Sequence, residues 1–199
     1  MSDNWARARY LDGSALVKLV VDEGDHEPVR TFFQSNTNFF ATSLCLAEAL
    51  GAIKAKWTHG RITEVQYFGC TRQLVINAWG KKIEVEDVGL FSPGGLSAVE
   101  ALARKHTLDL SDALQLETIL RGKHSHMGPN SSSVLITADS KLAAAAEVEH
   151  IRSWNCIASP LPATPNPSIE RTRSGSAGSA LISFWAKPAP PPRSAHVKR

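Results

Sequence analysis

Short apolar runs alternate with longer amphipathic stretches over the first 160 residues of the chain. The runs have the length of buried strands, and the stretches between them repeat apolar residues at the 3.6-residue period of a helix. The predicted strands are residues 9–12, 39–42, 83–88 and 134–137, with 153–158 as a candidate last strand. The predicted helices are residues 14–21, 27–35, 43–59, 63–79, 97–105, 111–121 and 140–149. This alternation predicts an α/β fold, a three-layer α/β/α sandwich around a parallel sheet of four to five strands.

A few residues mark the ends of these helices. Ser43 is the predicted N-cap of the helix over residues 43–59, and Gly60 is expected to end it. Thr63 and Gln66 have the spacing of a capping box, in which each side chain binds the backbone N–H of the other residue.

The composition of the chain changes at residue 160. Seven of the 11 prolines follow this position, and residues 161–199 hold six basic side chains against one acidic side chain. Such a segment buries too little apolar surface to offset the entropy that ordering would cost. We therefore expect one domain over residues 1–160 and a disordered, basic tail rich in Pro, Ser and Arg over 161–199. The first 160 residues are slightly acidic, which excludes a broad basic face that grips a nucleic-acid duplex.

Signals for membrane insertion or secretion are missing from the pattern. No apolar run approaches the roughly 20 residues that cross a bilayer, and the first residues lack the apolar core of a secretory signal. The three cysteines, Cys45, Cys70 and Cys156, are far apart and odd in number, so a disulfide framework or zinc site is not expected. We expect a soluble cytoplasmic protein without a membrane partner.

Two acidic residues occupy positions where parallel sheets bind ligands. Asp12 and Asp139 each follow a predicted strand directly and precede a helix. The carboxyl ends of parallel strands lie on one edge of the sheet, so both side chains are expected there. The alternative interpretation is that each aspartate only caps the following helix.

Two further acidic residues lie on predicted helices. Glu48 shares one face of its helix with Leu44, Ala47, Gly51, Ala52 and Ala55, and Asp112 aligns with Leu116, Ile119 and Leu120. An acid on a core-facing apolar stripe is costly unless it is paired or binds a metal. Four converging carboxylates without basic partners predict a divalent cation, and oxygen ligands favour Mg²⁺ or Mn²⁺.

Four segments together resemble the PIN domain, the nuclease fold of VapC-type bacterial toxins. They are residues 10–18 (YLDGSALVK), 46–54 (LAEALGAIK), 108–116 (LDLSDALQL) and 135–142 (LITADSKL), and the likeness runs from about residue 9 to 158. The resemblance implies that Asp12, Glu48, Asp112 and Asp139 are the catalytic, metal-binding acids. It also implies that the hydroxyl groups of Ser14 and Thr137 support this cluster. Asp109 lies outside the stripe of Asp112, and capping is its expected role.

The resemblance implies a metal-dependent endoribonuclease that hydrolyses phosphodiester bonds in single-stranded RNA. It further implies the toxin of a type II toxin–antitoxin pair, a homodimer with a small protein antitoxin. The alternatives are a housekeeping PIN-domain RNase and a non-catalytic PIN-like module that binds RNA. A haloacid-dehalogenase phosphatase would need a second acid where the chain has Ser14, and the acid pair and lysine of a receiver domain are not evident. His124 and His126 are interpreted as solvated loop residues, with a transition-metal pair as the weaker alternative.

Overall fold

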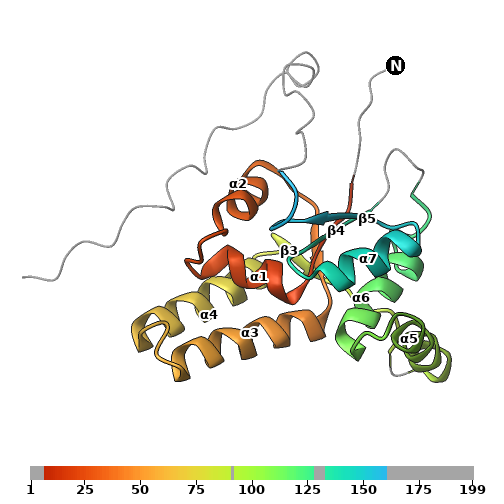
Figure 1. Ribbon diagram of the computed structural model, residues 1–199, viewed down its shortest axis with the longest axis horizontal. Helices are drawn as coiled ribbons and strands as arrows, with labels where there is room; N and C mark the ends of the chain where they lie inside the picture. Colours follow the sequence, from red (N-terminus) through yellow and green to blue (C-terminus); the bar gives the residue numbers. More distant parts are fainter. Residues whose placement is uncertain (1–6, 91, 128–132, 161–199) are drawn as a thin grey trace, which may run out of the picture. The chain divides into compact units, whose positions relative to one another are not determined.

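A computed structural model of the chain describes residues 7–90, 92–127 and 133–160 (Figure 1). The chain divides into two units, Met1–Pro162 and Ala163–Arg199, and every described element belongs to the first. The expected tail therefore lies outside the described residues. The elements follow in the order β1 (Arg9–Leu11), α1 (Gly13–Val20), α2 (Glu27–Ser35), β2 (Phe39–Ala41), α3 (Ser43–Thr58), α4 (Glu64–Trp79), β3 (Ile83–Val85), α5 (Pro93–His106), α6 (Leu110–Arg121), β4 (Val134–Thr137), α7 (Ser140–Val148) and β5 (Arg152–Asn155).

The five strands form one parallel sheet in the order β3-β2-β1-β4-β5. From β1 the chain proceeds to β2 and β3 in one direction, then returns to place β4 on the other side of β1. A crevice forms at such a change of direction, outside the carboxyl ends of the two central strands. Leu11 pairs with Ile136 in the sheet, so the next residues, Asp12 and Thr137, both lie at this edge.

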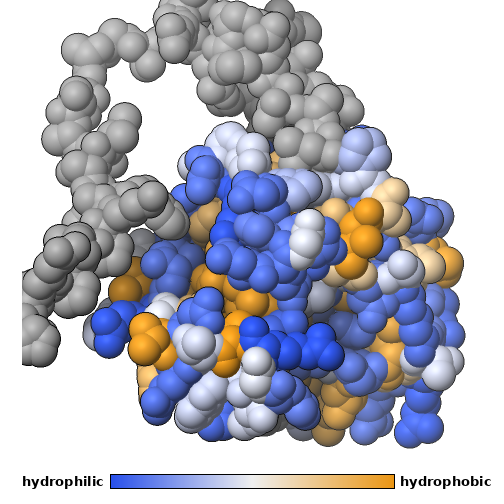
Figure 2. Space-filling model, turned by 60° about the vertical axis from the view of Figure 1, so that its left-hand side comes forward, coloured by the Kyte–Doolittle hydropathy of each residue, from blue (hydrophilic) through white to orange (hydrophobic). Residues whose placement is uncertain are grey.

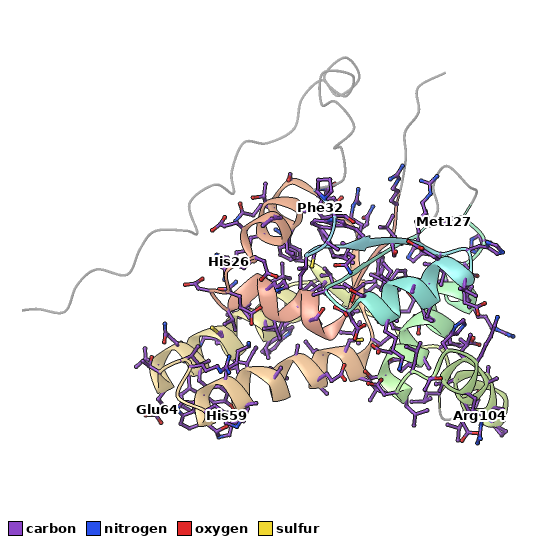
Figure 3. All side chains as sticks on the ribbon, viewed as in Figure 1. His26, Phe32, His59, Glu64, Arg104 and Met127 are labelled. Atoms are coloured by element: carbon purple, nitrogen blue, oxygen red, sulfur yellow. The ribbon has the colours of Figure 1, made fainter. Side chains whose placement is uncertain are left out.

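Each face of the sheet carries its own apolar core, because successive strand residues point to opposite faces. Leu11 and Ile136 pack in a core with α1, α2 and α3, whereas Tyr10 and Leu135 pack in a second core with α5, α6 and α7. Phe32 of α2, labelled in Figure 3, lies in the first core. Its ring is 5.1 Å from that of Trp154. Figure 1 shows α1, α3 and α4 grouped on the left and α5, α6 and α7 on the right. The predicted three-layer α/β/α sandwich with a central parallel sheet is thus confirmed.

The structure confirms one of the two predicted N-caps and corrects the other. The capping box between Thr63 and Gln66 is present at the start of α4. However, the N-cap of α3 is Thr42, whose side chain accepts a hydrogen bond from the N–H of Cys45; Ser43 is already helical. Thr42 is the residue with extended backbone angles, and a capping side chain must come from that residue.

Three other elements differ from the predicted ranges by more than one residue at an end. Strand β3 ends at Val85, three residues before the predicted end. Strand β5 begins one residue earlier than predicted and ends at Asn155, whose side chain accepts two backbone N–H groups in a turn. Helix α5 begins at Pro93, four residues before the predicted start. Its first turn contains Gly94 and Gly95, which have a low helix propensity, but the Ser92 cap and the proline at the first position start the helix there.

The cysteines are free thiols: Cys45 and Cys156 are buried and Cys70 is partly buried. Burial raises the pKa of the Cys45 thiol to about 12. Among the described residues, no helix is both long enough and apolar enough to cross a membrane.

Candidate functional site

A cavity of about 280 Å³ opens at the carboxyl edge of the sheet, beside the ends of β1 and β4. The structure brings all four predicted acids to its wall, from the β1–α1 junction, α3, α6 and the β4–α7 junction. A fifth acid, Asp109, also lines it. The described lining residues are Asp12, Gly13, Ser14, Val17, Glu48, Ala52, Asp109, Asp112 and Asp139, with no lysine or arginine among them.

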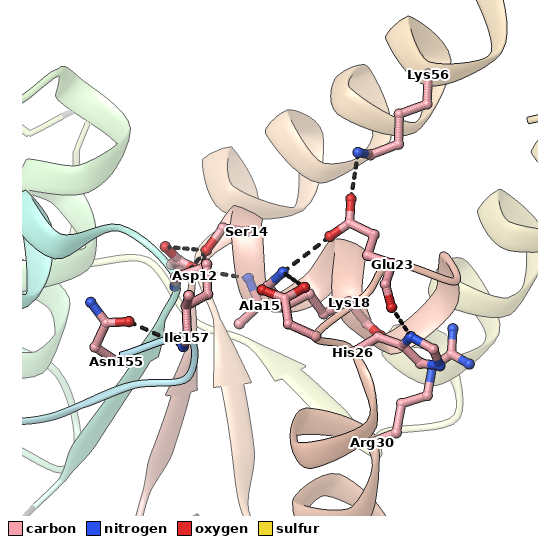
Figure 4. A network of polar contacts seen from close by, with 12 residues as sticks. Asp12, Ser14, Ala15, Lys18, Glu23, His26, Arg30, Lys56, Asn155 and Ile157 are labelled. Carbon is pink, nitrogen blue, oxygen red and sulfur yellow. Dashed lines mark hydrogen bonds and ion pairs between the residues drawn. The ribbon is translucent and has the colours of Figure 1, made fainter. Parts of the chain in front are cut away.

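Asp12 is the buried centre of this site, with only 3% of its surface exposed. One carboxylate oxygen accepts hydrogen bonds from the backbone N–H of Ala15 (2.7 Å) and the hydroxyl of Ser14 (2.8 Å), as Figure 4 shows. The other accepts a hydrogen bond from the hydroxyl of Thr137 (2.6 Å). Burial raises the pKa of Asp12, and these three donors partly oppose the rise. Asp12 is therefore a fixed acceptor that joins β1, α1 and β4.

Ser14 and Thr137 each connect the two central loops of the site. The Ser14 hydroxyl also accepts a hydrogen bond from the N–H of Ala138 (2.8 Å), and the Thr137 hydroxyl accepts one from the N–H of Asp139 (2.8 Å). Both hydroxyl groups thus lie between Asp12 and the loop that carries Asp139. Ser14 and Thr137 are therefore in contact with Asp12, as the resemblance implies.

Helix capping and a place in the cavity are not alternatives here. Asp12 caps α1, and Asp139 caps α7 by accepting hydrogen bonds from the N–H groups of Lys141 and Leu142. Asp109 caps α6 by accepting from the N–H of Asp112, as expected. Each cap also puts a carboxylate on the cavity wall, because the helices begin at the edge of the sheet.

Glu48 does not lie on a buried stripe, so that part of the prediction was wrong. The face of α3 that carries Glu48, Gly51, Ala52 and Ala55 is exposed, and the buried residues of the helix are Cys45, Ala49 and Ile53. Glu48 nevertheless lines the cavity, where its Oε2 accepts a hydrogen bond from the hydroxyl of Ser111 on α6 (2.7 Å).

Asp112 is half-buried and stands among the other acids. Burial and then the negative charges of Asp109, Asp12, Asp139 and Glu48 raise its pKa to about 7. The mutual repulsion anticipated from the sequence is thus present in the structure.

The buried lysine next to the site, Lys18, forms ion pairs with acids outside the cavity. Lys18 on α1 binds Glu23 (3.1 Å) and Asp25 (2.6 Å), and Glu23 also binds Lys56 of α3 (Figure 4). Burial by itself would lower the pKa of Lys18, but the hydrogen bonds to the two carboxylates outweigh it and raise the pKa. Lys18 is consequently committed to the α1–α2 loop and does not neutralise the cavity.

The donor set of the cavity fits a hard divalent cation chemically, because it consists of carboxylate and hydroxyl oxygens. In residues 7–90, 92–127 and 133–160, no group of three or more His, Cys, Asp or Glu side chains has an arrangement that could hold a metal ion. The oxygens of Asp12 are turned to hydrogen-bond donors, as is one oxygen each of Glu48 and Asp139. A cation would thus bind through the oxygens that accept no described hydrogen bond and through the remaining lone pairs of the others.

The sequence pattern did not predict that Gly13, Ser111 and Asp109 belong to the site. Asp109 had a usable signal, since it stands one turn before Asp112 at a helix start. Ser111 and Gly13 had none, because their role depends on the approach of α6 and α1 to α3.

The two histidines of the α6–β4 loop differ in their surroundings. The ring of His124 packs on Phe40 at 4.6 Å, and its Nε2 is buried without a hydrogen-bond partner in the described part of the chain. Burial lowers the pKa of His124. The interpretation as a solvated residue is therefore wrong for His124, while His126 is exposed.

Comparisons with known proteins assign no family to the chain. No protein-family model and no curated protein matches it. Among solved structures, the chain is similar to the crystal structure of PAE2754 from Pyrobaculum aerophilum, at 21% sequence identity and a TM-score of 0.48. That match covers 70% of this chain and 86% of the other.

Proposed function

We propose that the chain is a metal-dependent endoribonuclease that hydrolyses phosphodiester bonds in single-stranded RNA and acts in the cytoplasm. The observation that carries this proposal is the cavity in which Asp12, Glu48, Asp112 and Asp139 meet with Asp109 and without a described basic residue. Five carboxylates would repel a phosphodiester, so the substrate can approach only if a cation compensates their charge. The likeness of the four motifs to VapC-type PIN domains supports RNA as the substrate.

Glu48, Asp112 and Asp139, together with Asp12, would hold Mg²⁺ or Mn²⁺. The cation would supply charge compensation for the phosphate and would make a bound water more acidic. The residues would have separate tasks. Ser14 and Thr137 hold the Asp12 carboxylate in one orientation, so Asp12 would orient the part of the cavity wall that faces the substrate. Asp112, with a pKa near 7 when no cation is bound, must release its proton for binding.

The first prediction concerns cleavage. The full chain should cut a single-stranded RNA in Mg²⁺ or Mn²⁺, stop in EDTA and leave DNA of the same sequence intact. Asp12→Asn should abolish cleavage, because it removes a charge from the site while keeping an amide oxygen in place to cap α1. Gel analysis of end-labelled RNA measures both, and Asp87→Asn, an acid that binds the N–H of Ser43, is the matched control.

Cleavage that persists in EDTA in the full chain but not in Asp12→Asn would refute the metal requirement. Binding of RNA without cleavage in either cation would favour the non-catalytic module. Cleavage without toxicity on expression would favour a housekeeping RNase over a toxin.

A protein partner is also part of the proposal, and α4 supports it. One face of α4 exposes an apolar stripe, with 83% of Val65 and 84% of Trp79 accessible, and Arg72 stands in its middle. The stripe, defined here as Val65, Phe68, Arg72, Val75, Ile76 and Trp79, spans the length of the helix. Exposed apolar faces of this kind are typical of sites that bind an amphipathic helix.

The charge of the stripe favours a different protein over a second copy. In a twofold dimer through this face, the residue at its middle meets itself, so Arg72 would oppose Arg72. A helix of a small partner protein, apolar with a central Asp or Glu, would instead complement it. We therefore assign the stripe to such a partner, in the role of the expected antitoxin; the expected homodimer would use another surface.

A further inference from the structure

The carboxylate of Glu48 receives no described hydrogen bond from its own helix, α3. Its side chain projects from the exposed face of α3, whereas Asp12 is held by three donors and Asp139 by its cap. A glutamate side chain with three rotatable bonds loses considerable entropy when it is held in one orientation. Something outside α3 must therefore fix Glu48 if it is to face the cavity in one conformation.

Ser111 supplies the only described hydrogen bond to this carboxylate. Its hydroxyl donates to Oε2 of Glu48 over 2.7 Å, from the second residue of α6 to the second turn of α3. The bond engages one oxygen and leaves Oε1 for a ligand. Ser111 also directly precedes Asp112, so a single contact couples two of the cavity acids.

Gly13 bounds the same carboxylate from the side of α1. A Cβ atom at this position would lie 3.1 Å from Oε2 of Glu48, 3.3 Å from its Cβ and 3.4 Å from the carbonyl oxygen of Cys45. These distances are tighter than ordinary contacts, so a larger residue would push Glu48 or α3 away. The absence of a side chain at Gly13 lets the start of α1, and with it Asp12, approach Glu48.

We propose that Ser111 and Gly13 are positioning residues that hold Glu48 in the orientation required for selective Mg²⁺ binding. This inference rests on the proposed metal-dependent function. Mg²⁺ requires near-ideal octahedral geometry, whereas Ca²⁺ accepts irregular sets of oxygen ligands. Freeing Glu48 should therefore cost Mg²⁺ affinity more than Ca²⁺ affinity. The ratio of the two affinities thus reports on orientation, which a purely structural role would not change.

The test is titration calorimetry of the full chain with MgCl₂ and with CaCl₂, without RNA. Ser111→Ala should weaken Mg²⁺ binding by about 10- to 100-fold, the usual effect of losing a group that orients a ligand, and Ca²⁺ binding clearly less. Ser111→Thr keeps the hydroxyl and should retain the wild-type ratio. Gly13→Ala should lower the ratio as Ser111→Ala does. Ser97→Ala is the matched control, since its hydroxyl binds the carbonyl of Pro93 within α5.

A second arm separates positioning from folding. In a Glu48→Gln background, Ser111→Ala should have no further effect on Mg²⁺ affinity. In EDTA, the thermal unfolding midpoint of the single variant Ser111→Ala should match that of Ser97→Ala. An unchanged Mg²⁺ affinity in Ser111→Ala, or an equal loss for both cations, would overturn the inference while the proposed function stands. If the unaltered chain binds neither cation, the proposed function itself fails.

Discussion

Two aspartates of the same cavity show how much the surroundings of one residue decide. Asp12 is almost fully buried, yet three hydrogen-bond donors stabilise its charge. Asp112 is only half-buried, and burial together with the charges of four neighbouring acids raises its pKa to about 7. Burial raises the pKa of both groups. Hydrogen bonds oppose the rise for Asp12, whereas neighbouring negative charges add to it for Asp112.

The raised pKa of Asp112 predicts the pH dependence of stability without a cation. The folded protein holds this proton up to about pH 7, whereas the unfolded chain releases it near the ordinary value of 3.8. The folded state thus binds more protons between these values, and its stability should fall as the pH rises from 4 to 7. In EDTA, Asp112→Asn should remove this part of the slope and be more stable than the parent at pH 8.

Urea unfolding at pH 5 and pH 8 measures this effect. Glu100→Gln on α5, an exposed acid away from the cavity, is the control and should keep the parent slope. Parallel pH profiles for Asp112→Asn and the parent would show that the crowding of acids has no energetic consequence.

Among the elements, α3 shows how a helix is placed by its larger side chains. Both of its long faces are apolar, and one of them consists largely of alanine and glycine. Burial contributes about 25 cal/mol per Å² of apolar surface, so the face with the larger side chains gains more from the core. Ile53 is accordingly buried together with Cys45 and Ala49, and Leu46 and Leu50 pack against the same core. Gly51, Ala52 and Ala55 remain exposed with Glu48.

The cap of α3 gives a prediction that distinguishes two adjacent residues. Thr42→Ala should lower the free energy of unfolding by about 1–2 kcal/mol, because it removes the acceptor for the N–H of Cys45. Ser43→Ala should change it by less than about 0.5 kcal/mol, since Ser43 is exposed and already helical. Thr42→Ser, which keeps the hydroxyl, should recover much of the loss. Equal losses in the two alanine variants, measured by chemical denaturation, would contradict the assignment.

On the scale of the whole molecule, the acid cavity and the stripe on α4 are formed by different elements. Figure 2 shows apolar residues in separate patches on a largely hydrophilic face. His59 and Glu64 mark the connection between α3 and α4, where the stripe begins (Figure 3). Partner binding on α4 can therefore be altered without changing the residues that line the cavity.

The prediction for this surface concerns the binding of the small antitoxin that is proposed to contact the stripe. Arg72→Glu should weaken its binding to the full chain at least tenfold, as a like-charge contact replaces a charge pair. Trp79→Ala should weaken it as well, whereas Val148→Ala, an exposed apolar residue of α7, should not. Surface plasmon resonance measures the affinities. Light scattering that shows a dimer of the chain alone, lost in Trp79→Ala, would assign the stripe to a second copy.

The order of strands and helices along the chain, the parallel sheet and the placement of Asp12 and Asp139 could all be predicted from the amino-acid pattern. These follow from local rules, since apolar periodicity and the direction of a parallel strand act within a few residues. The resemblance also pointed to Ser14 and Thr137. Ser14 contacts Asp12 within the β1–α1 junction, and Thr137 contacts it from the neighbouring strand β4.

The buried face of α3 and the residues that fix Glu48 depend on how the helices pack against one another, so they could not be predicted. The hydrogen bond from Ser111 joins residues 63 positions apart, and the contact of Gly13 with Glu48 requires α1 and α3 to pack side by side. Periodicity favoured the face of α3 that carries Glu48, and it carries no information about the distance between helices. That distance is set by how the larger side chains fill the core, which is a property of the assembled fold.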